Sequence, residues 1–148
     1  MKYIKSILII VMIFMGIISI NTKEINIKKG VYYDNFNYTN NVTLKEVSGT
    51  TFDYSANLKN VGEYYEISFD IINDSNVDMI ISDYTIPEED KFIDYNISYT
   101  NGTKIKQGDI IKPGELKKVK YKVLYKNQID EDHYQFDPSF EINYEQNI

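Results

Sequence analysis

The chain has 148 residues, of which 43% are hydrophobic, with 14 tyrosines, seven phenylalanines and no tryptophan, a composition that suits one globular domain with a single core. Its formal net charge of −6 argues against a nucleic-acid partner, because phosphate binding along a nucleic acid needs clustered positive charge. The absence of cysteine excludes a disulfide framework and a thiolate metal site.

Residues 1–22 have the layout of an export signal, in which two lysines precede an apolar run from Ile7 to Ile20. As a helix this run would extend roughly 21 Å, which is shorter than a bilayer core of roughly 30 Å and favours a cleaved signal. No Ala-x-Ala-like cleavage site follows it, and Lys5 and Lys23 could reach the two interfaces. We therefore expect a signal-anchor helix, with a cleaved signal as the alternative. The membrane-contacting residues are expected to be Ile7, Leu8, Ile9, Ile10, Val11, Met12, Ile13, Phe14 and Met15.

Residues 23–40 are polar and poorly periodic, and we expect a tether there with one marginal strand near Val31 to Tyr33. Beyond them, alternation at period two recurs, which is typical of strands. It is clearest from Tyr64 to Ile72, where one face takes Tyr65, Ile67, Phe69 and Ile71 and the other takes Tyr64, Glu66, Ser68 and Asp70. We expect the first face to be buried and the second to be solvated.

The same alternation predicts further strands, at 42–47, 52–58, 77–82, 93–99, 118–126 and 140–144. Asn101-Gly102 directly follows one of them and predicts a hairpin with a two-residue type I′ turn. About seven short antiparallel strands predict an all-β domain, a two-sheet β-sandwich, over residues 41–148.

Two motifs resemble a known group of proteins. The stretch NVGEYYEISFDIINDSNVDMII, residues 60–81, resembles the strand and turn of bacterial Ig-like surface modules, the group that includes CARDB-like adhesion domains. The stretch IIKPGELKKVKYKVLY, residues 110–125, is similar to a later turn and strand of such modules. Together with the signal-like start, the chain also looks like small exported proteins of low-GC Gram-positive bacteria, among them the TasA/camelysin-type matrix proteins. The resemblance implies an Ig-like sandwich and no catalytic residues.

Candidate chemistry is sparse in the sequence. His133 is the single histidine and lies in an acidic stretch, where we expect a solvated loop side chain. The Asp74, Asn76 and Asp78 spacing opens like an EF-hand loop, but Met79 stands where glycine is needed and Thr85 where the bidentate glutamate is needed. We therefore expect no catalytic residue, no metal ligand and no cofactor.

One basic stripe stands out, formed by Lys118, Lys120 and Lys122 on one face of a predicted strand. One interpretation is cross-strand pairing with the Glu66, Ser68 and Asp70 face. The other is contact with an anionic surface such as cell-wall polymer or lipid headgroups. The sequence leaves both open.

The sequence thus predicts a non-enzymatic structural or adhesive module, held at the cell membrane with its C-terminal domain extracytoplasmic. Its expected partners are the membrane and either cell-wall polymer or other copies of itself, with no nucleic acid. The alternative function is an accessory binding subunit that captures a ligand or escorts another exported protein, and the alternative location is secretion after signal cleavage.

Overall fold

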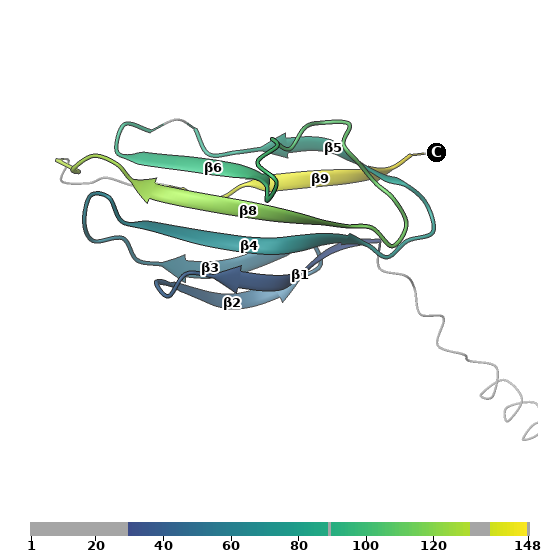
Figure 1. Cartoon of the computed structure of the whole chain (residues 1–148), viewed down its shortest axis with the longest axis horizontal. Helices are drawn as coiled ribbons and strands as arrows, with labels where there is room; N and C mark the ends of the chain where they lie inside the picture. Colours follow the sequence, from purple (N-terminus) through teal and green to yellow (C-terminus); the bar gives the residue numbers. More distant parts are fainter. Residues whose placement is uncertain (1–29, 89, 131–136, 148) are drawn as a thin grey trace, which may run out of the picture.

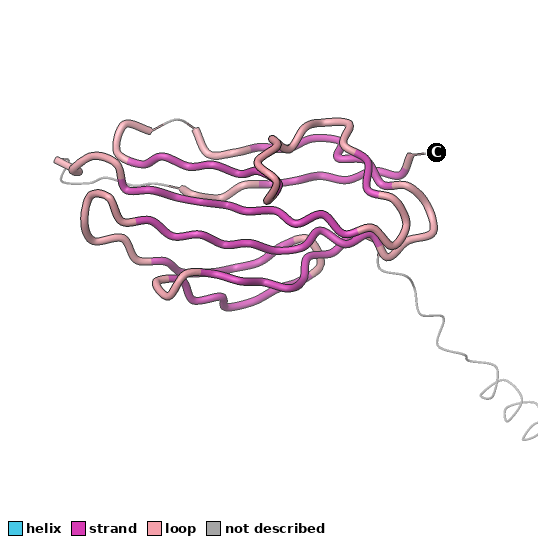
Figure 2. The backbone as a smooth tube through the Cα atoms, in the orientation of Figure 1, coloured by secondary structure: helices cyan, strands magenta, loops and turns pink. Residues whose placement is uncertain are grey.

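The computed structural model describes residues 30–88, 90–130 and 137–147, and this part of the chain is built from strands, turns and loops (Figure 2). In chain order the strands are β1 Val31–Tyr38, β2 Val42–Ser48, β3 Thr51–Ala56, β4 Tyr64–Asn73, β5 Met79–Thr85, β6 Ile93–Tyr99, β7 Ile110–Ile111, β8 Leu116–Tyr125 and β9 Glu141–Gln146. The predicted all-β fold is confirmed. The expected N-terminal helix and the expected membrane-contacting residues 7–15 lie outside the described residues.

The strands form three antiparallel sheets (Figure 1). The largest has the order β1-β4-β8-β6, the second pairs β2 with β3, and the third has the order β7-β5-β9. In Figure 1, β2 and β3 lie beside β1 and β4, whereas β5 and β9 lie beside β6 and β8. The two smaller sheets therefore cover different halves of the four-stranded sheet.

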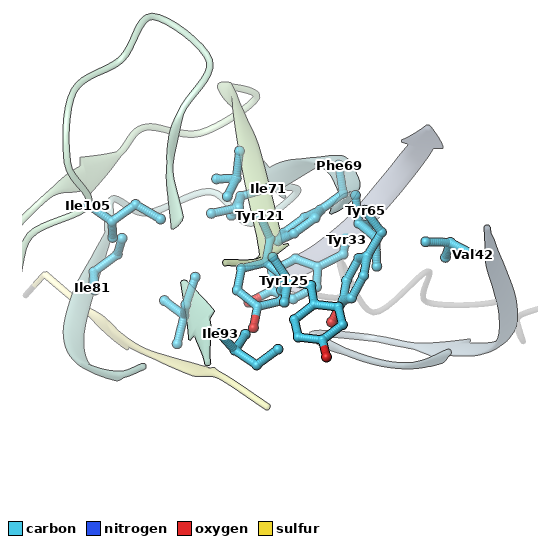
Figure 3. Packing of buried hydrophobic residues seen from close by; sticks show 14 of the residues in the cluster. Tyr33, Val42, Tyr65, Phe69, Ile71, Ile81, Ile93, Ile105, Tyr121 and Tyr125 are labelled. Carbon is cyan, nitrogen blue, oxygen red and sulfur yellow. The ribbon is translucent and has the colours of Figure 1, made fainter. Parts of the chain in front are cut away.

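The core lies on one face of the four-stranded sheet, which we call the inner face. It carries the apolar alternations of β4 and β8, in which Ile67 faces Tyr121 and Phe69 faces Val119, all fully buried. Figure 3 shows Phe69 and Tyr121 among the packed side chains of the core. The Phe69 ring lies 5.4 Å from the ring of Phe52 in β3 and 6.1 Å from that of Phe140, which immediately precedes β9. One inner-face residue thus contacts both smaller sheets, an arrangement consistent with a β-sandwich.

The sequence predicted a tether with one marginal strand near Val31 to Tyr33, whereas residues 31–38 form the full strand β1 and pair with β4. The sequence did not indicate the strand beyond Tyr33 because β1 carries a bulge between Asp34 and Asn37, with Asn35 at a positive φ of 53°. The extra residue places Tyr33 and Phe36 on the core three positions apart, and both rings pack on Phe69, at 4.6 and 5.6 Å between centroids. The period-two signal is lost although the strand is present.

The turn at Asn101-Gly102 exists, but the predicted type I′ geometry is wrong. Of its residues only Gly102 has a positive φ, 87°. The Tyr99 N–H donates to the Thr103 carbonyl at 2.9 Å, which closes a three-residue loop whose last position needs the positive φ. After the turn a single bridge joins Ser98 to Lys104.

The short strand β7, only two residues long, is below the length at which alternation can be recognised.

Candidate functional site

The three lysines that the sequence singled out lie side by side on the face of β8 opposite the core, which we call the outer face. Lys118 Nζ lies 3.6 Å from an Asp70 carboxylate oxygen, and Lys120 Nζ lies 3.9 Å from a Glu66 oxygen. Lys122 Nζ lies 4.3 Å from the centroid of the Tyr64 ring. The stripe therefore makes the cross-strand contacts with β4 that one interpretation predicted, and its contact with an anionic surface stays a prediction.

Asp70 departs from the expectation that its face of β4 is solvated, since only 4% of the residue is exposed. Its Oδ2 accepts a hydrogen bond of 2.9 Å from the Asn35 amide nitrogen, in the bulge of β1. Its Oδ1 has no hydrogen-bond donor among the residues the structure describes, and the Lys118 ammonium is the charge that faces it. The sequence predicted only a marginal strand near Val31 to Tyr33, and it did not indicate that the bulge beyond Tyr33 covers this carboxylate.

A polar pocket of about 490 Å³ lies beside the outer stripe, where the β6 turn, the segment leading to β7 and the start of β8 meet. It contains more positive than negative groups, since four lysines and two carboxylates line it. Its lining residues are Tyr99, Thr100, Asn101, Thr103, Lys104, Lys106, Asp109, Glu115, Lys117 and Lys118. Sequence analysis missed it because Lys104 and Lys106 lie in an irregular segment, outside any alternating pattern.

The Tyr99 hydroxyl organises one wall of this pocket. It donates to Asp109 Oδ2 at 2.7 Å, and the same oxygen accepts the Lys106 backbone N–H at 2.9 Å. Burial, together with the hydrogen bond to Asp109 and the charge of that carboxylate, raises the pKa of Tyr99 above its usual value of 10. Tyr99 therefore stays a neutral donor at physiological pH, and Asp109 is held within the wall.

Other hydroxyl groups of the core pair with one another. Tyr33 and Tyr144 share a hydrogen bond of 3.0 Å, and Tyr54 and Tyr65 share one of 2.9 Å. Burial raises the pKa of Tyr33 to about 12 and that of Tyr65 well above its usual range. These phenols are therefore neutral at physiological pH, and their hydroxyl groups hydrogen-bond to one another.

Asn73 is a fully buried polar side chain at the end of β4. Its amide nitrogen donates to the carbonyls of Val77 at 2.9 Å and Ile111 at 2.7 Å, and its oxygen accepts from the Ser75 N–H and hydroxyl. The side chain thus ties the β4–β5 turn to β7. This turn is the one whose acidic residues resemble the start of a calcium loop.

Within residues 30–88, 90–130 and 137–147 no three histidine, cysteine or carboxylate side chains gather closely enough to hold a metal ion. His133 and its acidic neighbours 131 and 132 lie outside these ranges. The same part of the chain contains no helix long and apolar enough to cross a membrane.

Another hollow, of about 670 Å³, lies between the end of β5 and β6. Its walls mix aliphatic side chains such as Ile86, Ile93 and Ile97 with charged ones such as Asp94 and Lys126.

Comparison with known proteins found no matching family model, no matching curated protein and no matching solved structure.

Proposed function

We propose that this protein is a non-enzymatic surface module, an Ig-like β-sandwich held at the outer side of the cell membrane by its N-terminal apolar segment, with a structural or adhesive role. The proposal combines the export-like start of the sequence with an all-β domain. It also rests on the resemblance of the motifs at 60–81 and 110–125 to Ig-like surface modules. These motifs lie on β4–β5 and on β7–β8.

The observation that carries the proposal is that buried polar side chains of the domain bond to other groups of the same domain. Tyr33 is bonded to Tyr144, and Asp70 is held by Asn35 and Lys118. Asn73 is saturated by backbone and Ser75. Reactive groups of an enzyme instead point at a site where a substrate atom can approach. Such a domain presents a stable surface, which is what a structural or adhesive module needs.

Location is tested on the native protein in its own cells. We expect it in the membrane fraction, with Met1 retained in the intact mass and with the domain digested by protease added to whole cells. A mature form beginning between Asn21 and Lys29 would replace the anchor with a secreted domain. Protection from protease in intact cells, with loss of that protection on lysis, would overturn the extracytoplasmic location.

The structural role is tested separately from the location. Crosslinking of intact cells followed by size-exclusion chromatography should give heterogeneous, high-mass assemblies. A discrete complex of fixed stoichiometry would instead favour the accessory binding subunit, and a single monomeric peak would contradict self-assembly.

A further inference from the structure

We propose that the pocket beside Tyr99 is a binding site for a phosphate group, with Lys104, Lys106 and Lys117 as its cationic donors. We call it the lysine pocket. The inference goes beyond the proposed function, because phosphate binding can be measured on the isolated chain wherever the protein resides. It also assigns the anion-binding role to lysines other than the outer stripe.

The first argument is charge compensation. In the described part of the chain, no carboxylate oxygen lies within 4 Å of the ammonium groups of Lys104, Lys106 or Lys117, whereas Lys118 and Lys120 each have one. The nearest aromatic partner of Lys117 is the Tyr99 ring, 5.4 Å from its Nζ. The chain as a whole carries a formal charge of −6. A pocket with a positive balance on an acidic protein is a local attractor for anions.

The second argument is that the pocket's own carboxylates are engaged elsewhere. Asp109 accepts hydrogen bonds from the Tyr99 hydroxyl and the Lys106 N–H. Glu115 Oε2 accepts the Lys112 N–H at 2.7 Å, which fastens it to the turn before β8. Neither carboxylate forms an ion pair with Lys104, Lys106 or Lys117, so neither one compensates the positive charge of these lysines. The lysines are therefore left to meet an anion from solution.

The third argument is the presence of neutral donors on the same wall. Thr100 and Thr103 line the pocket together with Asn101. The Asn101 side-chain oxygen accepts from the Thr103 N–H at 2.9 Å and from its hydroxyl at 2.7 Å. The amide nitrogen of Asn101 is thereby the end of the side chain left to donate. Together with the Thr100 hydroxyl it adds directional donors to three point charges.

This combination suits phosphate better than carboxylate. A phosphate group has three or more acceptor oxygens in a tetrahedral arrangement and carries up to two negative charges as a monoester. Ammonium groups act on it as compact point charges and can approach from several directions. A carboxylate has two oxygens in one plane and is matched best by the planar fork of arginine, a residue that the sequence lacks.

The test is a calorimetric titration of the full-length chain in detergent with inorganic tripolyphosphate, at low salt and again at 0.15 M salt. The test variant is Lys104→Gln/Lys106→Gln/Lys117→Gln. The matched control, Lys45→Gln/Lys59→Gln/Lys126→Gln, changes the net charge equally. All six side chains are at least partly exposed, so both variants should melt within a few degrees of the parent protein. We expect the test variant to lose at least about tenfold in affinity, as three exposed charge contacts imply, and the control to lose less than about threefold.

A second variant keeps the proposal testable without any change of charge. Thr100→Val removes one hydroxyl donor from the pocket wall and should weaken tripolyphosphate binding about two- to threefold, while citrate binding stays unchanged. Equal loss in the test and control triple variants would overturn the site, because it would mean that net charge alone attracts the anion. Equal affinity for citrate and tripolyphosphate in the parent protein would overturn the assignment to phosphate.

Two sources of phosphate are separated by further arms of the same comparison. One arm uses a soluble polyglycerol phosphate, and the other uses phosphatidylcholine vesicles with and without phosphatidylglycerol. If only binding of the soluble polymer depends on the three lysines, the ligand is a phosphodiester polymer. If binding of both the polymer and the phosphatidylglycerol vesicles depends on them, the pocket recognises the phosphate group in either source. Dependence on these lysines for vesicles alone, with none for tripolyphosphate or polymer, would contradict a pocket that holds a phosphate group.

Discussion

The two faces of the four-stranded sheet differ in how they use the same strands. On the inner face of β4 and β8, the fully buried Phe69 and Tyr121 pack against aromatic rings from both smaller sheets. On the outer face, Lys118 and Lys120 stand against Asp70 and Glu66, and both lysine side chains are 40% exposed or more. One face removes apolar area from water, and the other arranges charged pairs whose lysines remain largely hydrated.

This difference separates stability from recognition. Burial of apolar area contributes about 25 cal/mol per Å², whereas exposed ion pairs contribute about 0–1 kcal/mol each. We therefore infer that substitutions on the inner face control folding, and that outer-face charges can be changed with little effect on the fold. The predictions below test that division at named positions.

The largest effect is expected for Phe69→Ala. Phe69 is fully buried, and its ring lies between Tyr33, Phe52 and Phe140. Its truncation leaves a cavity that should cost about 3–5 kcal/mol of unfolding free energy. Since domains without disulfides lie toward the low end of about 5–15 kcal/mol, the variant should be largely unfolded or poorly expressed. Urea denaturation followed by circular dichroism measures the loss.

The matched control is Ser68→Ala, one residue away on the outer face. The Ser68 hydroxyl makes only a long hydrogen bond of 3.4 Å to the Asn37 carbonyl, so its removal should change the unfolding free energy by no more than about 0.5 kcal/mol. Equal shifts of the urea midpoint for the two variants would contradict the assignment of the two faces.

The next effect is a loss of stability at alkaline pH. Burial raises the pKa of Tyr33 from its usual 10 to about 12, so the folded state holds this proton more tightly than the unfolded state. The contribution of this group to stability is therefore constant below pH 10 and is lost as the pH rises from 10 to 12, by about 2–3 kcal/mol. Unfolding free energies measured across that window should decline.

Lysines also titrate in this range, so the decisive quantity is the difference between the parent protein and Tyr33→Phe. The variant loses the hydrogen bond to Tyr144, 3.0 Å long in the parent, as a constant offset. It should then lose less stability between pH 10 and 12 than the parent does. Parallel pH curves for the two proteins would show that Tyr33 keeps its ordinary pKa.

Asn73 tests whether the inner face can hold a polar group for a structural reason. Asn73→Ala leaves the Val77 and Ile111 carbonyls without their donor and should cost about 2 kcal/mol, since each unsatisfied buried group costs about 1–3 kcal/mol. Urea denaturation measures this loss. Ser75→Ala, which removes only one donor to the Asn73 oxygen, is the milder control, and a larger loss for Ser75→Ala would contradict the central role of the amide.

The sequence predicted the regular strands well, because each has one dry and one wet face. The buried apolar residues of β4 that alternation indicated are Tyr65, Ile67, Phe69 and Ile71, and those of β8 are Val119, Tyr121, Val123 and Tyr125. The pairing of the lysines with acidic residues of β4 was also foreseen as one interpretation. These features depend on period two alone, which is visible in any single strand.

The rest depended on contacts between segments distant in the chain. The bulge at Asn35 interrupts the alternation beyond Tyr33, so only a marginal strand was expected there and the burial of Asp70 by the bulge was not predicted. The lysine pocket assembles Lys104, in an irregular segment, with Lys117 at the start of β8. No local pattern encodes that meeting, because it arises from the path of the chain after the Gly102 turn.

The smallest effects are expected for the outer-face ion pairs, and they differ from each other. A double-mutant cycle for Glu66 and Lys120, whose side chains are 33% and 40% exposed, should give a coupling free energy of about 0.2–1 kcal/mol. The cycle for Asp70 and Lys118 should give a larger value, because the Asp70 side chain is only 5% exposed and its charge is less hydrated. Neutral partners, Glu66→Gln with Lys120→Gln and Asp70→Asn with Lys118→Gln, keep the side-chain shapes.

Raising the salt concentration should weaken the Glu66–Lys120 coupling more than the Asp70–Lys118 coupling, because exposed charges are screened more strongly. Equal couplings with equal salt dependence would mean that the bulge of β1 does not shield Asp70 from water.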